Sequence, residues 1–510
     1  MRAGERLAVI DLGSNSFRLV VFAAGDGFWR RTDEIYEPVR IGEGMGESGE
    51  LGSEPTRRAL ATLDVFAHFC RAAGLSGAQV ETVATSAIRE AVNRDEFLAQ
   101  AGRHFAEPIR VLSAHDEARY GYIAAANSTT IQDGLVLELG GGSMQVVHVA
   151  GREERETASW PLGTVRMTER FVPPNGAAKP RQLKALGEHV ASELARAEWL
   201  DAAGGDGAVM VGVGGTVRNL AAAVQRAAGL PSGVVQGVEI SRPCLEELIA
   251  RLAALPAEER ASIPGIKPAR ADLILAGALV VLGVMRHGGF DTLQATEAGL
   301  REGIFLERLL APSDPPLVED VRRAGVMNLA NQYDLRSEHT EHVAALALEM
   351  FDQLAALGLH AGDPGERELL WAACMLHDIG MSIDYDDHHK HSRYLILNGG
   401  LPGFTPQETA IVAQAARYHR KGLPSPGPLG ALFDGARLAE LDRCALLLRL
   451  AEDLERSRDQ LVRAVELADD GETVDLRLVA SGETAVPRWA ASREGGLFRR
   501  AFGRELAVAG

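Results

Sequence analysis

The hydrophobic pattern of roughly the first three hundred residues predicts strands and helices in alternation. Short apolar runs at 6–11 and 17–24 have the length of strands and flank a polar turn, LGSNS. Apolar positions at helical spacing follow over 59–74. Strand-like runs recur at 80–85 and, as a second pair around a turn, at 135–149. This alternation predicts an α/β fold up to about residue 308.

The pattern changes after a segment rich in proline and aspartate, APSDPPLVED, which predicts a linker. Beyond it, apolar positions keep helical spacing to about residue 468, and strand-like runs such as TVDLRLVA then return. These changes predict four parts of the chain, namely two α/β lobes at 1–128 and 129–310, a helical domain at 311–468, and a small strand-containing region at 469–510.

Two segments of the α/β part repeat each other. IDLGSNSFRLVVF and LELGGGSMQVVHV superpose at one constant offset, which places Asp11 on Glu138 and Ser16 on Ser143. The match keeps the apolar runs on both sides of the turn as well as the acid. Two equivalent hairpins in two α/β halves predict a duplicated, two-lobed fold with a cleft between the lobes.

The repeated turns have the composition of phosphate-binding loops. A tight turn rich in glycine and serine points successive backbone N–H groups into one concavity, which binds anions. GVGGT is a third such turn and opens onto a helix, whose N-terminus also favours anions. Ordinary hairpin turns are the alternative, but three glycine turns, two of them sharing an acid, favour phosphate. The candidate phosphate-binding residues are Gly13, Ser14, Asn15, Ser16, Gly140, Gly141, Gly142, Ser143, Gly214, Gly215 and Thr216.

Composition and charge exclude several classes of protein. The net charge of −17 argues against a general nucleic-acid-binding or membrane-surface protein, although an anionic substrate needs only local donors. The longest apolar run, 273–285, is too short to span a bilayer, and the first residues have no signal-peptide layout. The four cysteines are scattered without a CxxC pair. We therefore expect a cytoplasmic protein with reduced thiols.

A series of motifs resembles one known family. In chain order they read VIDLGSNSFRLVVF, VRIGEGM, VATSAIREAVN, VLSAHDEARYGY, LELGGGS, WPLGTVRMTERF, GVGGTVRNLA, IPGIKPARADLILAGA and GLREGIF. The series resembles the exopolyphosphatase/guanosine pentaphosphatase (Ppx/GppA) family, of the actin–hexokinase–chaperone ATPase superfamily. The resemblance implies a duplicated actin-like (ribonuclease H-like) α/β fold, followed by an all-α HD-like domain and a small C-terminal α/β tail.

The resemblance also implies roles for single residues. The catalytic base of the family is a glutamate in an S-G-x-E-E-A-R segment, which here reads SAHDEAR and makes Glu117 the candidate. Arg89 matches an arginine that faces the substrate phosphates, and its planar fork suits them. Arg18, in the first hairpin, is a weaker candidate for the same cleft. Asp11 and Glu138 would hold Mg2+, which phosphoanhydride hydrolysis usually requires.

Two positions depart from the family pattern D-I/L-G-G-G-S-T-E. Glu138 replaces the aspartate and is one methylene longer, so it would hold magnesium in a shifted position. Met144 and Gln145 replace the last two residues, and Gln145 thereby removes a carboxylate. A neutral amide is neither a base nor a good magnesium ligand. The pattern therefore leaves open whether the site is slowed or altered in substrate.

Histidines gather in the second half of the chain. Eight of the 14 lie between His339 and His419. The segment resembles metal-dependent HD phosphohydrolases, which use H…HD…D, and implies a second metal site at His339, His377, Asp378 and Glu452. One alternative is a helical domain that keeps these residues structurally. Another is a channel for an anionic chain, lined by His388, His389, Lys390, His391, His419, Arg420 and Lys421.

The resemblance implies an exopolyphosphatase that processively releases orthophosphate from the end of inorganic polyphosphate, and a homodimer. The alternative substrate is guanosine pentaphosphate (pppGpp), attacked at its 5′ phosphoanhydride. Three other functions stay open: a weakly active regulator that binds polyphosphate or an alarmone, a sugar or acetate kinase of the same superfamily, and an independent HD nucleotidase. We expect neither nucleic acid nor membrane as a partner.

Overall fold

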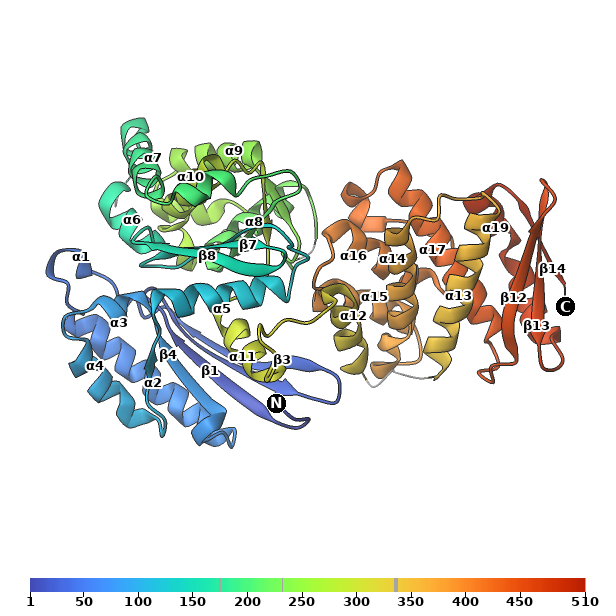
Figure 1. Ribbon diagram of the computed structural model, residues 1–510, viewed down its shortest axis with the longest axis horizontal. Helices are drawn as coiled ribbons and strands as arrows, with labels where there is room; N and C mark the ends of the chain where they lie inside the picture. The colour runs from blue at the N-terminus through green and yellow to red at the C-terminus, as the bar shows by residue number, and fades with distance from the viewer. Residues whose placement is uncertain (174–175, 232, 334–337, 510) are drawn as a thin grey trace. The chain divides into compact units, whose positions relative to one another are not determined.

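The computed structural model describes residues 1–173, 176–231, 233–333 and 338–509, and it divides into two compact units (Figure 1). The first unit comprises Met1–Gly229 and Val235–Val321, and the second comprises Leu230–Val234 and Arg322–Gly510.

The first sheet of unit one has the strand order β3-β2-β1-β4-β5. Strands β1, β2 and β3 form an antiparallel meander. Strand β4 pairs with β1 in parallel, and β5 pairs with β4 in parallel. Successive residues of β1, such as Val9 and Ile10, belong to different hydrophobic cores on the two faces of the sheet. The elements of this lobe are β1 (Arg6–Leu12), β2 (Phe17–Ala24), β3 (Trp29–Glu37), α1 (Met45–Ser48), α2 (Ser53–Ala72), β4 (Val80–Ala84), α3 (Ser86–Glu90), α4 (Arg94–Ala101) and β5 (Arg110–Val111).

The second sheet repeats this topology in the order β10-β11-β9-β6-β7-β8. Here β6, β7 and β8 form the meander, and β9 pairs with β6 in parallel as β4 does with β1. Its elements are β6 (Gly134–Leu139), β7 (Met144–Ala150), β8 (Glu153–Trp160), α6 (Thr164–Phe171), α7 (Pro180–Leu194), β9 (Val209–Val213), α8 (Gly215–Ala227), β10 (Glu239–Ser241), α9 (Arg242–Ala254), α10 (Ile274–His287) and β11 (Thr292–Ala295). The predicted duplicated, two-lobed α/β fold is confirmed.

Two helices join the lobes. Helix α5 (Ala114–Ala126) contacts β6, β7, β8 and β9, and α11 (Leu300–Leu310) contacts α5 and β1. One core runs from Val9 of β1 through Ile123 and Ile304 of these helices to Val136 of β6. The last helix of the α/β part therefore packs against the first sheet. The boundary between lobes at residues 128 and 129 stays a prediction.

Unit two is a helical bundle with a small sheet at its C-terminal end. Helix α17 (Gly435–Leu454) lies at the centre of the bundle, where it packs against α13, α14 and α16, and its buried residues include the charged Asp442 and Arg449. The other helices of the bundle are α12 (Val321–Asn331), α13 (Glu338–Ala356), α14 (Pro364–Leu376), α15 (His388–Gly399) and α16 (Pro406–Tyr418). The all-α domain expected from the sequence is thus present.

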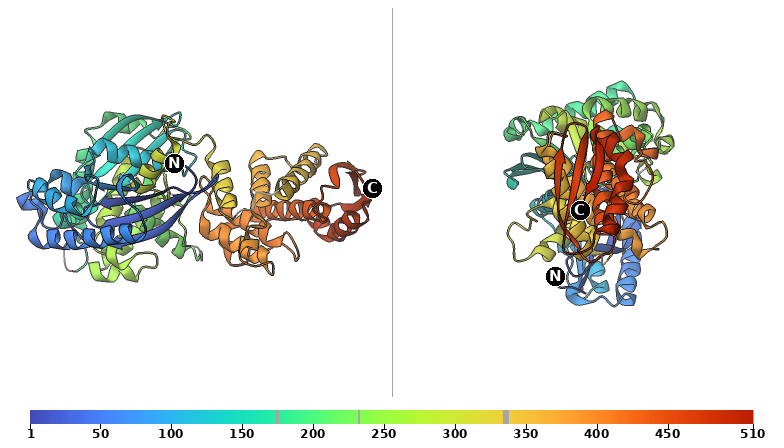
Figure 2. Two further views of the ribbon diagram at one scale, coloured as in Figure 1. Left: turned by 90° about the horizontal axis from the view of Figure 1, so that it is seen from below. Right: turned by 90° about the vertical axis from the view of Figure 1, so that its right-hand side faces the viewer.

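The C-terminal sheet has the order β12-β13-β14, with α18 and α19 packed beside β14 (Figure 2). Its elements are β12 (Val462–Asp469), β13 (Thr473–Ala480), α18 (Ala485–Ala491), α19 (Gly495–Phe502) and β14 (Glu505–Ala509). The helical pattern predicted to residue 468 ends earlier, because β12 begins at Val462. An irregular register between Val462 and Ala464 interrupts the alternation that would have revealed this strand. No helix in the described residues is long and apolar enough to cross a membrane.

Candidate active site

A cavity of about 110 Å³ opens in unit one where β1 and β6 end at their glycine turns. Backbone turns, carboxylates and arginines line it. The turn residues are Gly13, Ser14, Asn15, Ser16, Gly140, Gly141, Ser143, Gly214 and Gly215; the carboxylates are Asp11, Glu117 and Glu138; and the arginines are Arg18, Arg218, Arg270 and Arg301. The structure thus brings together most of the residues that the sequence pointed to.

The two repeated turns touch each other. A Cβ on Gly142 would lie 2.6 Å from Ser86 Oγ and 2.9 Å from Ser14 Oγ, closer than packed atoms approach. Ser14 Oγ in turn lies 3.0 Å from Ser86 Oγ and accepts a hydrogen bond from the Ala87 N–H at 3.2 Å. Both Asn15 side-chain polar atoms are buried and, within the described chain, have no hydrogen-bond partner. The contact therefore holds two donor-rich turns at one place.

The third turn is built for close approach of a charged group. Gly214 has φ 106°, a conformation that favours glycine, and it starts helix α8. A Cβ on Gly215 would lie 2.6 Å from Arg270 Nη2, so only glycine lets this guanidinium lie against the turn. The N-terminus of α8 and Arg270 therefore face the cavity together.

Glu117 is a buried carboxylate on the first turns of α5. Ser113 caps this helix and accepts a hydrogen bond from the Asp116 N–H. Burial raises the pKa of Glu117 to about 7, although Arg89 opposes the shift and Asp11 adds to it. Arg89 Nη1 donates to Glu117 Oε2 and, at 2.8 Å, to the Leu112 carbonyl. A carboxyl group whose pKa lies near neutral pH can exchange a proton with water.

Asp11 and Glu138 occupy the equivalent positions of β1 and β6. Burial raises the pKa of both carboxyl groups, that of Glu138 to about 8, with Glu117 and Asp11 adding to the Glu138 shift. Arg301 Nη1 lies 3.2 Å from Asp11 Oδ2. Glu138 Oε2 is buried without a hydrogen-bond partner among the described residues. Two carboxylates beside turns that are predicted to bind phosphate suit Mg2+, which takes one or two carboxylates together with substrate phosphates.

Gly121 accommodates the longer side chain of Glu138. It lies one turn after Glu117 on α5, and a Cβ there would be 2.4 Å from Glu138 Oε2. The extra methylene of Glu138 is thus matched by the absence of a side chain on the facing helix. The longer acid is evident in the sequence, but its partner is not, because no local pattern connects the two residues.

Gln145 supports the turn and does not line the cavity. It is the cross-strand partner of Glu138, is 2% exposed, and its Nε2 donates to Ser143 Oγ at 2.8 Å. A glutamate at this position would place a further carboxylate beside Glu138. The substitution noted from the sequence therefore exchanges charge for a hydrogen bond that orients Ser143.

Three predicted phosphate-binding residues lie outside the cavity lining. Gly142 lines a neighbouring pocket, and Arg89 reaches the site through Glu117. Thr216 is buried, and its methyl carbon lies 2.5 Å from where a Cβ on Gly277 would be. Direct contact of these three residues with phosphate stays a prediction.

Three arginines of the cavity were not singled out from the sequence. Arg218, Arg270 and Arg301 join Arg18, and burial together with mutual repulsion lowers the pKa of Arg18 to about 10. The same causes lower the pKa of Arg218 and Arg270. The motifs GVGGTVRNLA, IKPARADL and GLREGIF contain them, and this was the available signal. Such a concentration of positive charge, held beside three carboxylates, suits an anionic substrate.

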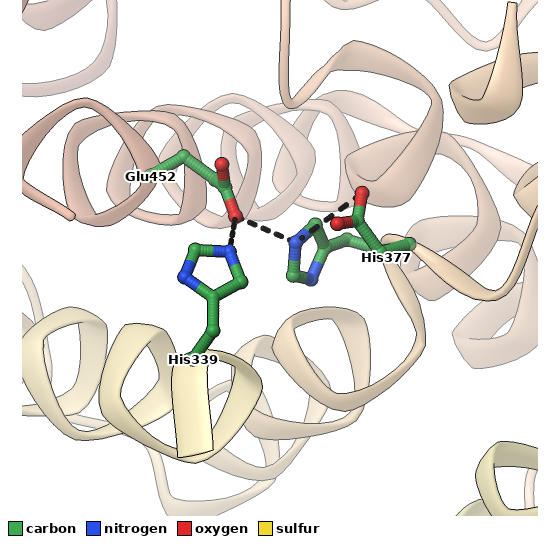
Figure 3. Close-up of side chains that lie close together, drawn as sticks. His339, His377 and Glu452 are labelled. Atoms are coloured by element: carbon green, nitrogen blue, oxygen red, sulfur yellow. Dashed lines mark hydrogen bonds and ion pairs between the residues drawn. The ribbon is translucent and has the colours of Figure 1, made fainter. Parts of the chain in front are cut away.

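The histidines predicted to form a second metal site meet in unit two. His339 and His377 point toward the Glu452 carboxylate (Figure 3), and His377 Nε2 lies 3.6 Å from Asp378 Oδ1. Burial alone would lower the pKa of His377, but Asp378 and Glu452 raise it to about 9. The cluster therefore attracts positive charge.

The residues proposed as a channel divide into buried and exposed groups. His388, His389 and His419 are buried, and the first and third of them join the metal-ligand cluster. Lys390 is exposed and pairs with Asp387 at 2.6 Å. The side chains therefore do not form one uniform surface.

Known proteins resemble this chain over both units. A model of the Ppx/GppA phosphatase family matches residues 20–311, and a model of domain III of that family matches residues 321–483. A solved Ppx/GppA protein from Aquifex aeolicus is 28% identical with a TM-score of 0.51, over 60% of this chain and 98% of that one.

Two further structures share the fold. An exopolyphosphatase-like protein is 26% identical with a TM-score of 0.54, over 60% of this chain and 100% of that one. An exopolyphosphatase from Cytophaga hutchinsonii is 21% identical with a TM-score of 0.55, over 60% of this chain and 98% of that one. The family models together span most of the chain. The chain therefore belongs to the Ppx/GppA phosphatase family, whose members hydrolyse phosphoanhydrides.

Proposed function

We propose that the protein is an exopolyphosphatase, which processively hydrolyses the terminal phosphoanhydride of inorganic polyphosphate and releases orthophosphate. The observation that carries the proposal is that three glycine turns and four arginines line one cavity together with the buried carboxylate of Glu117. One terminal phosphate does not require four arginines. Their number supports a substrate that presents several phosphates to the same cavity.

In the proposed reaction, backbone N–H groups of the three turns and the hydroxyls of Ser14 and Ser143 hold the terminal phosphoryl oxygens. Glu117 orients a water and takes one of its protons as the water oxygen bonds to the terminal phosphorus. The anhydride bond then breaks, the shortened chain keeps the bridging oxygen, and orthophosphate leaves. Asp11 and Glu138 would hold Mg2+, which when bound neutralises phosphate charge.

The second candidate substrate is guanosine pentaphosphate. A pocket next to the main cavity supports it as an alternative. This pocket of about 230 Å³ shares Ser14 and Gly141 with the main cavity. Its lining includes Met45, Ala87 and Val165, together with Glu90, Arg166 and Glu169. Apolar side chains and two carboxylates suit a nucleoside better than a polyanion.

Phosphate release from polyphosphate and from guanosine pentaphosphate, with and without Mg2+, tests the proposal. We expect Mg2+-dependent release from polyphosphate that falls by about 10²-fold or more in Glu117→Gln, the size of a general-base contribution. Asp116→Asn, on the adjacent residue of the same helix, is the matched control and should keep the rate. Full activity of Glu117→Gln would exclude this residue as the base. Binding of polyphosphate without turnover would instead select a regulator.

We further propose a homodimer in the cytoplasm. Val486 and Trp489, three residues apart on one face of α18, are exposed apolar side chains and support self-association. The four cysteines are free and carry no CxxC pair, which supports a reducing compartment. Sedimentation of the purified chain measures its oligomeric state.

A further inference from the structure

We propose that the helical unit holds a dinuclear centre for divalent first-row transition-metal ions. Five helices supply the ligands from their ends or first turns. Four of these ligands are indicated by the sequence. The structure adds two histidines, and with them a position for a second ion. The six side chains are His339, His377, Asp378, His388, His419 and Glu452.

The first ion position lies among His339, His377, Asp378 and Glu452. His339 Nε2 is 3.0 Å and His377 Nε2 is 2.6 Å from Glu452 Oε1. His377 Nε2 is also 3.6 Å from Asp378 Oδ1. Two ligand atoms about 2.1 Å from one ion lie roughly 3.0–3.4 Å apart at ordinary coordination angles, so one ion fits here once the 2.6 Å pair of His377 and Glu452 separates by a few tenths of an ångström.

The second position lies among Asp378, His388 and His419. His388 Nε2 is 3.1 Å from His419 Nε2, and these atoms are 3.2 Å and 3.7 Å from Asp378 Oδ1. The same oxygen, Asp378 Oδ1, is therefore common to both positions. Arg458 Nη2 lies 3.1 Å from the other oxygen, Oδ2, and leaves Oδ1 to the ions. A bridging carboxylate is the usual link in two-metal sites.

The backbone orients three of the imidazoles as ligands. Nδ1 of His377, His388 and His419 lies 2.6 Å, 2.9 Å and 2.7 Å from the carbonyl oxygens of residues 374, 385 and 416, respectively. A carbonyl oxygen only accepts, so each Nδ1 carries a proton and donates it. In the neutral imidazole the lone pair is then on Nε2, the atom that faces the cluster.

This arrangement is unfavourable without a cation. Two neutral imidazoles with protonated Nδ1 atoms cannot hydrogen-bond through Nε2, yet these atoms of His388 and His419 are 3.1 Å apart. His377 Nε2 is fully buried and makes no hydrogen bond to the residues that the structure describes, although Glu452 Oε1 is close. Imidazole ligands suit Fe2+, Ni2+ and Zn2+, and a set that adds the carboxylates of Asp378 and Glu452 also suits Mn2+, whereas Mg2+ is held by oxygen ligands.

Metal analysis of the full-length protein tests the proposal. The purified protein is stripped with a chelator, loaded with Mn2+ in excess Mg2+, which fills any magnesium-type site in the cleft, and then desalted. We expect two manganese ions per chain. His339→Gln and His388→Gln should each lose one ion, and Asp378→Asn should lose both.

His360→Gln is the matched control, because its Nε2 bonds the Phe351 carbonyl away from the cluster. It should keep both ions. Thermal unfolding with and without Mn2+ gives a second readout, and the wild type should gain stability that Asp378→Asn does not. A wild-type protein that retains no manganese would overturn the proposal, because protons alone would then separate the ligands. A wild-type protein that retains one ion, with no loss in His388→Gln, would also overturn it.

Discussion

Gly121→Ala should displace the Glu138 carboxylate and slow the reaction. A Cβ at position 121 would lie 2.4 Å from Glu138 Oε2, whereas such atoms do not approach within 3.0 Å, so the oxygen must retreat by at least 0.6 Å. A displacement of about 1 Å in a catalytic group costs about 10²-fold. We therefore expect kcat/KM to fall by about tenfold to 10²-fold, or about 1.4–2.7 kcal/mol.

The same substitution should change the stability of helix α5 only slightly. Alanine is about 1 kcal/mol more favourable than glycine inside a helix, which offsets part of the crowding. Gly187→Ala is the matched control, since Gly187 is also helical and a Cβ there meets no described atom within 4 Å. Its activity should stay at the wild-type level. Activity and stability are thus expected to separate in Gly121→Ala alone.

A double-mutant cycle with Glu138→Asp measures the pairing directly. Aspartate is one methylene shorter, so Glu138→Asp alone should also lose activity. Gly121→Ala combined with Glu138→Asp should recover part of it, because the shorter acid leaves room for the new methyl group. The assay is the initial rate of phosphate release over a range of Mg2+ concentrations, together with urea unfolding of all four proteins. Additive losses in the double variant would refute the proposed fit.

Three further outcomes are expected. Gln145→Glu places a carboxylate beside Glu138, so half-maximal activity should need less Mg2+. The metal-free variant should also melt at a lower temperature. An unchanged Mg2+ requirement would show that glutamine at this position does not affect metal binding. In metal-free protein, burial raises the Glu138 pKa from 4.5 to about 8, so its contribution to stability is full below pH 4.5 and is lost as pH rises through 8. Glu138→Gln should remove that loss, about 4 kcal/mol at pH 8, and equal urea midpoints of variant and wild type at both pH 5 and pH 8 would contradict the shift. Arg301→Lys keeps the charge but loses the planar fork, so KM for polyphosphate should rise about tenfold, whereas exposed Arg308→Lys on the same helix should leave it unchanged.

Local pattern was sufficient for the two strand pairs and for the glycine turns between them. The apolar runs that became β1 and β6, and the turns at 13–16 and 140–143, are recognised from a few neighbouring residues. The repeat of Asp11 at Glu138 could likewise be found by comparing two segments. Strand β12 was missed because its irregular register breaks the period-two signal on which the prediction depends.

The sequence by itself indicated the two-lobed class of fold and the glycine turns with their acids, because periodicity and turn chemistry are properties of adjacent residues, and the family resemblance added Glu117. Only the tertiary structure decided that Arg18, Arg218, Arg270 and Arg301 share one cavity. It also decided that Gly121 leaves space for Glu138. Convergence of this kind depends on strand register and helix packing between segments far apart in the chain, and no short stretch of sequence encodes it.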